Sequence, residues 1–191
     1  LRAVPGLTVL RPADANEVVE AWKVIMQKKK EPAALVLTRQ AVPTFDRTKY
    51  GSAAGVAKGA YILADAPDGK PDVILMATGS DVQLCVDAYE RLKAEGVKAR
   101  VVSMPSWDIF EHQDEQYRTQ VLPPDVLARV AVEQASTLGW SQYTGMHGVV
   151  LGMHTFGASA PLKELQKKFG FSPDKVVEAA RTAIGRAKKH S

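Results

Sequence analysis

The chain has 191 residues, of which 46% are hydrophobic and 24% are charged, with a formal net charge of +4 and a single cysteine. This composition is typical of a soluble globular protein with a real core, and the longest apolar runs are far shorter than the ~20 residues of a membrane-spanning helix. One thiol excludes an internal disulfide framework and fits a reducing compartment, so we expect a cytoplasmic protein with no membrane partner.

The chain begins with Leu1 instead of methionine. Its length fits one domain plus a piece of another, so we expect a fragment of a longer protein. Its positive charge does not indicate a nucleic-acid partner. The lysine clusters at 28–30, 167–168 and 188–189 stand where helices are expected to end, and cations stabilise a helix dipole there by ~0.3–1 kcal/mol.

The first 40 residues predict a strand, a helix and a second strand. A β-like run at 8–10 precedes an amphipathic stretch from 16 to 30, and residues 34–38 form a buried-strand run. This is one βαβ unit of a parallel sheet. Parallel sheets need both faces covered, so the unit belongs to a larger domain. Its apolar surface should lead to self-association or to docking of residues 1–40 against the rest of the chain.

Residues 46–59 predict a linker, because Gly51, Ser52, Gly55 and Gly59 lie in a stretch with little apolar periodicity. The remainder, 60–191, predicts an α/β domain. It has strands near 60–63, 73–77, 100–104, 129–133 and 149–153, and helices near 81–94, 162–168 and 174–188. The connection between the first two strands is hairpin-like. We predict a three-layer α/β fold with about five strands, mostly parallel with one antiparallel edge strand, preceded by the partial βαβ unit.

Several spaced motifs resemble the transketolases. They are Pro-Ala-Ala-Leu-Val-Leu-Thr-Arg-Gln at 32–40, Pro-Asp-Val-Ile-Leu-Met-Ala-Thr-Gly-Ser at 71–80, Ser-Met-Pro-Ser-Trp-Asp-Ile-Phe at 103–110, and Gly-Ala-Ser-Ala-Pro at 157–161. The third is the most discriminating and continues through Gln113-Asp114 and Tyr117-Arg118 to Pro123. The resemblance implies that residues 1–45 are the end of a pyrimidine-binding domain and 60–191 a C-terminal domain.

The family resemblance implies a transferase of the pentose phosphate pathway that moves two-carbon ketol units between sugar phosphates. It also implies a homodimer, with thiamine diphosphate and a divalent metal (magnesium or calcium) in the full-length enzyme. The family holds the diphosphate through a Gly-Asp-Gly motif and a downstream asparagine. This chain has no such motif, and its only asparagine is Asn16. We therefore expect the chain alone to bind no cofactor and to be catalytically silent.

Arg39 is the expected substrate-binding residue. It follows a predicted parallel strand at the carboxyl end, where α/β sheets place ligands, and a guanidinium matches a phosphate bidentately. The resemblance implies that Arg39 holds the phosphate of a sugar-phosphate substrate. From the residue alone, a surface arginine in a salt bridge remains the alternative.

Structural interpretations are favoured for the other candidates. An anion could bind at Thr78-Gly79-Ser80, but Asp81 would repel it and instead predicts helix capping. The histidines lack metal-ligand spacing: His112, His147, His154 and His190. Cys85 lies on an apolar helix stripe, so we expect a buried small hydrophobic residue instead of a nucleophile. A group of acidic residues predicts a solvated helix start: Asp108, Glu111, Asp114 and Glu115.

Two alternative functions stay open. The chain could be a non-catalytic module for dimerisation or for binding a regulatory ligand. Within the enzymes, it could be the same part of a dihydroxyacetone synthase or of a deoxyxylulose phosphate synthase. The stretch from Tyr117 to Pro123 disfavours the latter more strongly.

Overall fold

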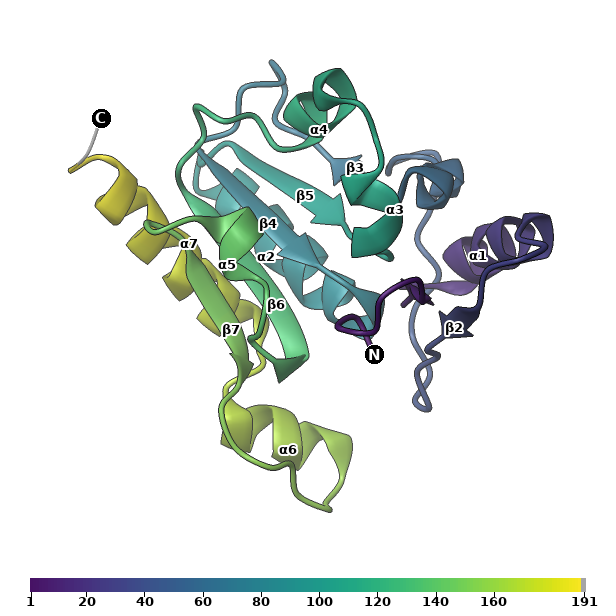
Figure 1. The fold of residues 1–191 in the computed structure, drawn as a ribbon. Helices are drawn as coiled ribbons and strands as arrows, with labels where there is room; N and C mark the ends of the chain where they lie inside the picture. Colours follow the sequence, from purple (N-terminus) through teal and green to yellow (C-terminus); the bar gives the residue numbers. More distant parts are fainter. Residues whose placement is uncertain (190–191) are drawn as a thin grey trace.

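The computed structural model describes residues 1–189 and contains two separate sheets (Figure 1). The smaller sheet pairs β1 (Thr8–Leu10) in parallel with β2 (Ala33–Leu35), and α1 (Ala15–Gln27) connects them, which confirms the predicted βαβ unit. β2 ends earlier than predicted, because its neighbour β1 stops at Leu10 and the next residue, Arg11, turns to another part of the chain.

Helix α1 leaves much of its apolar surface uncovered. Ala21 is fully buried, but Val19 is 55%, Trp22 50% and Met26 74% exposed. Its covered side packs against η1 (Ala53–Lys58), and the outer side has no partner within the described residues. Lys28 has an extended backbone and follows the last helical residue, as the lysine cluster at 28–30 predicts.

The larger sheet has five strands in the order β3-β5-β4-β6-β7. All neighbours are parallel except β3, which lies antiparallel to β5 at one edge. This agrees with the predicted fold class. The strands are β3 (Tyr61–Ala64), β4 (Val73–Ala77), β5 (Ala99–Ser103), β6 (Arg129–Ser136) and β7 (Val149–Met153).

The prediction of a hairpin-like connection between β3 and β4 is wrong. β3 pairs with β5, and β4 lies on the other side of β5. The cause is visible just after β3. Asp65 accepts hydrogen bonds from Arg100 Nε (2.7 Å) and Nη2 (2.9 Å), and its carbonyl accepts one from the Tyr89 hydroxyl (3.0 Å). These contacts hold the end of β3 beside β5, so the following loop has to pass beyond β5 to reach β4.

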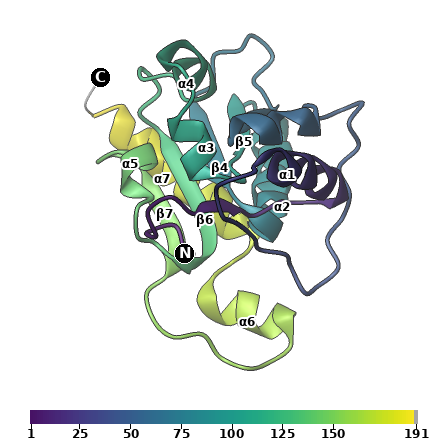
Figure 2. The same cartoon turned by 45° about the vertical axis from the view of Figure 1, so that its right-hand side comes forward.

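Helices cover both faces of the larger sheet and complete three layers (Figures 1 and 2). One face packs against α2 and α7, the other against three short helices and their loops. Side chains of β4 alternate between the faces: Leu75 joins the core beneath α2, and Met76 joins Trp107 and Trp140 on the other face. The helices are α2 (Val82–Ala94), α3 (Trp107–Glu111), α4 (Glu115–Val121), α5 (Ser141–Thr144) and α7 (Pro173–Ala187).

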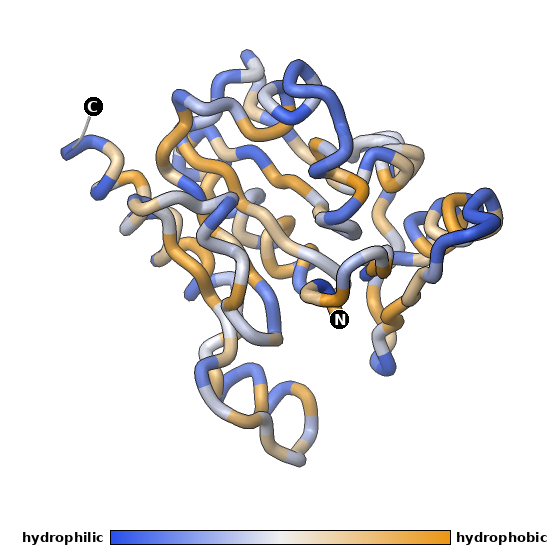
Figure 3. The backbone as a smooth tube through the Cα atoms, viewed as in Figure 1, coloured by the Kyte–Doolittle hydropathy of each residue, from blue (hydrophilic) through white to orange (hydrophobic). Residues whose placement is uncertain are grey.

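Hydrophobic segments concentrate in the central strands, and hydrophilic ones line the outer loops (Figure 3). α6 (Leu162–Phe169) projects away from the sheet in both ribbon views and has no fully buried residue. Among the described residues, no helix combines the length and apolar character needed to cross a membrane.

The predicted linker contains ordered structure. Residues Ala53–Lys58 form a 3-10 helix, η1, which packs against α1 and β3. Ser52 starts it by accepting a hydrogen bond from Ala54 N (3.3 Å), and Gly59 ends it at a φ of 82°. The domain boundaries at 45 and 60 stay a prediction, but the segment between them is part of the contact between the two sheets.

Candidate functional site

The chain just after β1 lies across the carboxyl ends of β4 and β5. Arg11 N donates to Pro105 O (2.8 Å), and Arg11 O accepts from Gly79 N (3.0 Å). Nearby, Asp108 Oδ2 accepts from Val9 N (3.1 Å). The βαβ unit is therefore docked on the rest of the chain, at the edge of the sheet where α/β proteins bind their ligands.

Two arginines of the N-terminal segment share one carboxylate of the larger sheet. Glu133 on β6 accepts from Arg2 Nη1 (2.8 Å), from Arg11 Nη1 and from Trp140 Nε1 (2.7 Å). The Arg2 guanidinium also lies 4.1 Å from the centre of the Trp107 ring. Burial alone would raise the pKa of Glu133, but Arg2, Arg11 and the indole N–H outweigh it and hold that pKa below its usual value. Glu133 is therefore a charged anchor for the docked segment.

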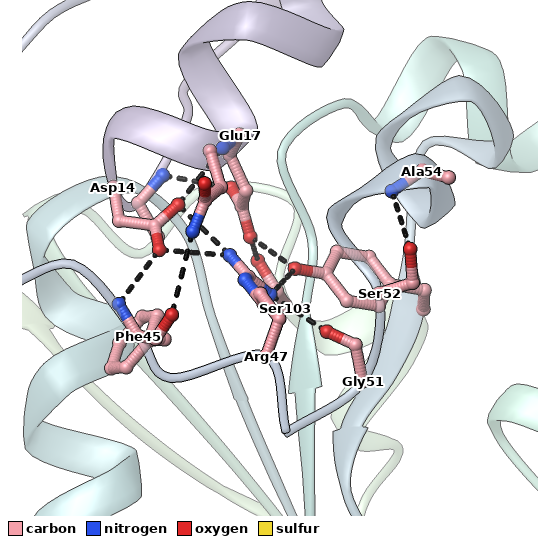
Figure 4. A network of polar contacts seen from close by, with 11 residues as sticks. Asp14, Glu17, Phe45, Arg47, Gly51, Ser52, Ala54 and Ser103 are labelled. Carbon is pink, nitrogen blue, oxygen red and sulfur yellow. Dashed lines mark hydrogen bonds and ion pairs between the residues drawn. The ribbon is translucent and has the colours of Figure 1, made fainter. Parts of the chain in front are cut away.

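A second carboxylate, Glu17 on α1, is fully buried between the two parts (Figure 4). Its Oε1 accepts from the hydroxyls of Ser103 (2.6 Å) and Tyr61 (2.7 Å), and its Oε2 accepts from Ala13 N (2.7 Å). Burial raises the pKa of Glu17 despite these three hydrogen bonds. No cation among residues 1–189 forms an ion pair with it, so it acts as a hydrogen-bond acceptor that joins α1 to β3 and β5.

Asp14 and Arg47 extend this network to the segment before η1 (Figure 4). Both carboxylate oxygens of Asp14 lie 2.9 Å from Arg47 Nη2, and Asp14 also accepts from Phe45 N (2.9 Å). Arg47 Nη1 donates to the Tyr61 hydroxyl (2.9 Å) and to Gly51 O (2.8 Å). One arginine thus ties α1, the predicted linker and β3 together.

Arg39 lies in the loop after β2, as the sequence predicts, and its side chain is exposed. Among the described residues it has no hydrogen-bond or ion-pair partner. It lines a pocket of about 400 Å³ together with Arg11, Gln83 and Gln134. The salt-bridge alternative therefore has no support within residues 1–189, while the phosphate role stays a prediction.

The prediction that Asp81 caps a helix is wrong. Its carboxylate is buried and turned toward β6, where it accepts from Gln134 N (2.8 Å) and from the Gln134 side-chain amide. It makes no capping bond to α2. Burial raises the pKa of Asp81 despite the two bonds from Gln134. Of the three residues considered for anion binding, Gly79 already donates its N–H to Arg11 O.

No group of three or more metal-binding side chains forms among residues 1–189. His112 Nδ1 lies 2.6 Å from Asp108 O, and His154 is exposed. His190 lies outside the described residues, so its assignment stays a prediction. Cys85 is buried, as predicted, and burial raises the pKa of its thiol well above the usual value.

The prediction that four acidic residues belong to a solvated helix start is correct for three of them. Glu111, Asp114 and Glu115 are exposed, and Asp114 caps α4 by accepting from Tyr117 N (2.7 Å). It is wrong for Asp108, which is half-buried because the docked β1 segment covers it and donates Val9 N to it.

Sequence reasoning missed Glu17 and Glu133, although each leaves a signal. Asp14 and Glu17 have the three-residue spacing of a capping box, and Asp14 does accept from Glu17 N (2.8 Å). Glu133 ends a continuous apolar run, Val130-Ala131-Val132, inside a buried strand. A carboxylate in such a place needs charged or hydrogen-bonding partners, so it predicts a contact with another segment.

The two sheets and the contacts between them define a multidomain α/β protein, in which the end of one parallel-sheet domain is docked on the carboxyl edge of a second α/β domain. Family models agree. Residues 1–44 match the transketolase pyrimidine-binding domain, and residues 59–172 match the transketolase-like C-terminal domain. The chain belongs to the transketolase family.

Individual relatives show the same likeness. A transketolase from Geobacillus stearothermophilus is 48% identical over 97% of this chain. The structure of a transketolase from Leishmania mexicana matches 97% of the chain with a TM-score of 0.89 and 40% identity. A Pichia stipitis transketolase in complex with sedoheptulose-7-phosphate matches 98% with a TM-score of 0.88 and 39% identity. The chain spans 28%, 26% and 26% of these three proteins.

Proposed function

We propose that the chain is the C-terminal part of a transketolase subunit, and that its own contribution to the reaction is Arg39, which holds the phosphate of a sugar-phosphate substrate. One observation supports this most directly: Arg39 follows a parallel strand, is exposed, and has no acceptor among the described residues, so its guanidinium is free for a ligand. The Pichia stipitis relative, in complex with sedoheptulose-7-phosphate, supports the substrate class.

A free guanidinium binds a phosphate through two parallel charge-assisted hydrogen bonds. Each such bond contributes about 1.5–3 kcal/mol, which corresponds to roughly a tenfold or hundredfold change in affinity. Arg39 would fix the phosphorylated end of the sugar and so orient its reacting carbon, because a substrate held at one end loses rotational freedom.

The described residues do not fit the cofactor of the family. Thiamine diphosphate supplies the electron sink for the carbanion in ketol transfer. Its diphosphate needs a divalent metal with oxygen ligands, and among the described residues no group of three or more His, Cys, Asp or Glu side chains could hold one. We therefore propose that cofactor and metal, magnesium or calcium, are bound by other parts of a full-length homodimer of the pentose phosphate pathway in the cytoplasm.

The test of Arg39 uses a complete subunit that has this chain as its C-terminal part. Arg39→Ala should raise the KM for a phosphorylated ketose about 10- to 100-fold, and leave the KM for an unphosphorylated ketose unchanged, because only the phosphate contact is lost. Arg91→Ala is the matched control, since Arg91 pairs with Asp174 on the surface. An equal effect of Arg39→Ala on both sugars would contradict the proposal.

The isolated chain should show no ketol transfer and no binding of thiamine diphosphate. Calorimetry with thiamine diphosphate and magnesium, followed by an activity assay of the same sample, measures both. Activity of the chain alone would show that the assignment of the cofactor site to other segments is wrong.

A further inference from the structure

Arg11 connects β1 to α1 and is held by the larger domain from several sides. Its main-chain N–H donates to Pro105 O, and its carbonyl accepts from Gly79 N. Its Nη1 donates to Glu133 of β6. Gly79 lies against the guanidinium, since a Cβ at that position would come within 3.3 Å of Nε and Nη2. Glu133 therefore defines where the Arg11 side chain lies.

The charges around Arg11 balance. Arg2 and Arg11 both pair with Glu133, and the buried carboxylate of Asp81 is a second acidic group beside them. Burial raises the pKa of Asp81, and the positive charge of Arg11 opposes this rise. Among the described residues that line the pocket of about 400 Å³, the charged ones are Arg11 and Arg39. Since carboxylates already neutralise Arg11, its role at the pocket is structural.

The loop after β2, residues 36–45, is anchored at its two ends. At its start, Val36 N donates to Leu10 O (2.8 Å). At its end, Phe45 N donates to Asp14 Oδ2 (2.9 Å), as Figure 4 shows. Between these anchors the loop makes no further hydrogen bond to the part of the chain that the structure describes. Its position therefore depends on the segment that supplies the two acceptors.

Arg11 lies between the two acceptors of that segment, because Leu10 precedes it directly and Asp14 follows three residues later. A shift of Arg11 would move both anchors and the 36–45 loop with them. Arg39 stands in this loop, three residues after the first anchor. A displacement of about 1 Å in a group that positions a substrate can cost roughly 100-fold in rate, so the hold on Arg11 matters at Arg39.

We propose that Glu133 is a positioning residue, which holds Arg11, thereby fixes the 36–45 loop, and so places Arg39 for its ligand. Glu133 is not among the described residues that line the pocket, so it acts through Arg11 and not by touching the ligand. The identity of the ligand rests on the proposed function, whereas the placement of the loop is measurable without a ligand. The larger domain thereby takes part in substrate binding.

Glu133→Gln in a complete subunit tests the effect on substrate binding. The amide has the size of the carboxylate but no charge, so Arg11 loses its ion pair. The KM for a phosphorylated ketose should rise about threefold to tenfold, while kcat and the KM for an unphosphorylated ketose stay unchanged. In an Arg39→Ala background, Glu133→Gln should add nothing, because the guanidinium that it misplaces is gone. Full additivity of the two effects would overturn the proposal.

Asp65→Asn is the matched control, because it makes the same change from carboxylate to amide in another ion pair. Asp65 pairs with Arg100 inside the larger domain and contacts neither Arg11 nor the 36–45 loop. The variant should lower the melting temperature but leave the ratio of the two KM values unchanged. A change in this ratio as large as that of Glu133→Gln would show that loss of stability alone produces the effect, and would overturn the proposal.

Hydrogen exchange in the ¹⁵N-labelled chain measures the placement of the loop without a ligand. The Val36 amide should exchange several-fold faster in Glu133→Gln, because its bond to Leu10 O is no longer held in place, and at an unchanged rate in Asp65→Asn. Glu133→Asp keeps the charge but is one methylene shorter, so it should give an intermediate rate. It carries the same measurements if Glu133→Gln does not fold.

Two results separate this inference from the proposed function. Unchanged exchange of Val36 and an unchanged ratio of KM values in Glu133→Gln, with the expected effect of Arg39→Ala, would overturn only this inference. Faster exchange of Val36 in Glu133→Gln, with an equal effect of Arg39→Ala on both sugars, would overturn only the proposed function.

Discussion

The hydroxyl of Ser103 donates a 2.6 Å hydrogen bond to the carboxylate of Glu17, which precedes it by 86 residues in the chain. Ser103 is the last residue of β5, and Glu17 lies in the first turn of α1. Both side chains are completely buried. The contact between the two sheets therefore depends on polar groups that water does not reach, where a missing partner is costly.

Replacing Glu17 by alanine should lower the free energy of unfolding by about 2–5 kcal/mol, because three buried donors lose their acceptor. Urea denaturation measures the change. Glu20→Ala is the control on the same helix and should stay within about 0.5 kcal/mol, since Glu20 only pairs with Lys23 at the surface. A double-mutant cycle with Ser103→Ala should show coupling, and strict additivity would contradict the bond as an interdomain contact.

Stability should also depend on pH through Glu17. Burial raises its folded-state pKa above the ordinary value of 4.5, so between these two values the folded chain binds more protons than the unfolded chain. The free energy of unfolding due to this group therefore falls as pH rises from 4.5 through the folded pKa. Urea denaturation over a pH series should show a less negative slope for Glu17→Gln in that window. An identical slope in both proteins would contradict the raised pKa.

Gly59 ends η1 and should tolerate no side chain. A Cβ there would lie 2.3 Å from Phe110 N and 2.5 Å from Ser106 O, so backbone atoms would have to move. Gly69 has a similar positive φ, 68° against 82°, but open space around it. Gly69→Ala measures the conformational cost alone, about 1–2 kcal/mol, and Gly59→Ala should cost clearly more. Equal melting temperatures of the two variants would contradict the close packing of η1 against α3.

The exposed apolar side of α1 should make the isolated chain self-associate. Trp22→Glu places a charge in the centre of that surface and should shift sedimentation toward the monomer. Leu138→Glu is the control, because Leu138 is 78% exposed, lies between β6 and α5 and is not part of α1. Monomeric behaviour of the unchanged chain would contradict the prediction.

Periodicity in the sequence predicts the five strands and the helices α2, α6 and α7 of the larger domain, because each has a local apolar pattern, but not the short helices α3, α4 and α5. The pairing of β3 with β5 has no local signal, since Asp65 and Arg100 are 35 residues apart and only the folded chain brings them together. The same holds for the site. Arg39 belongs to a recognisable motif, but Glu17 and Glu133 gain their significance only where the two sheets meet.

The buried polar network also has a consequence for how such proteins can be recombined. Asp14 and Glu17 belong to one part of the chain, Arg47 to the segment between the parts, and Tyr61 and Ser103 to the other part. A chimaera joined within residues 46–59 would combine halves from two parents, and would leave unmatched donors in its interior wherever the parents differ at these positions. The predicted linker is thus a poor crossover point for recombination, and the two parts are expected to be inherited together.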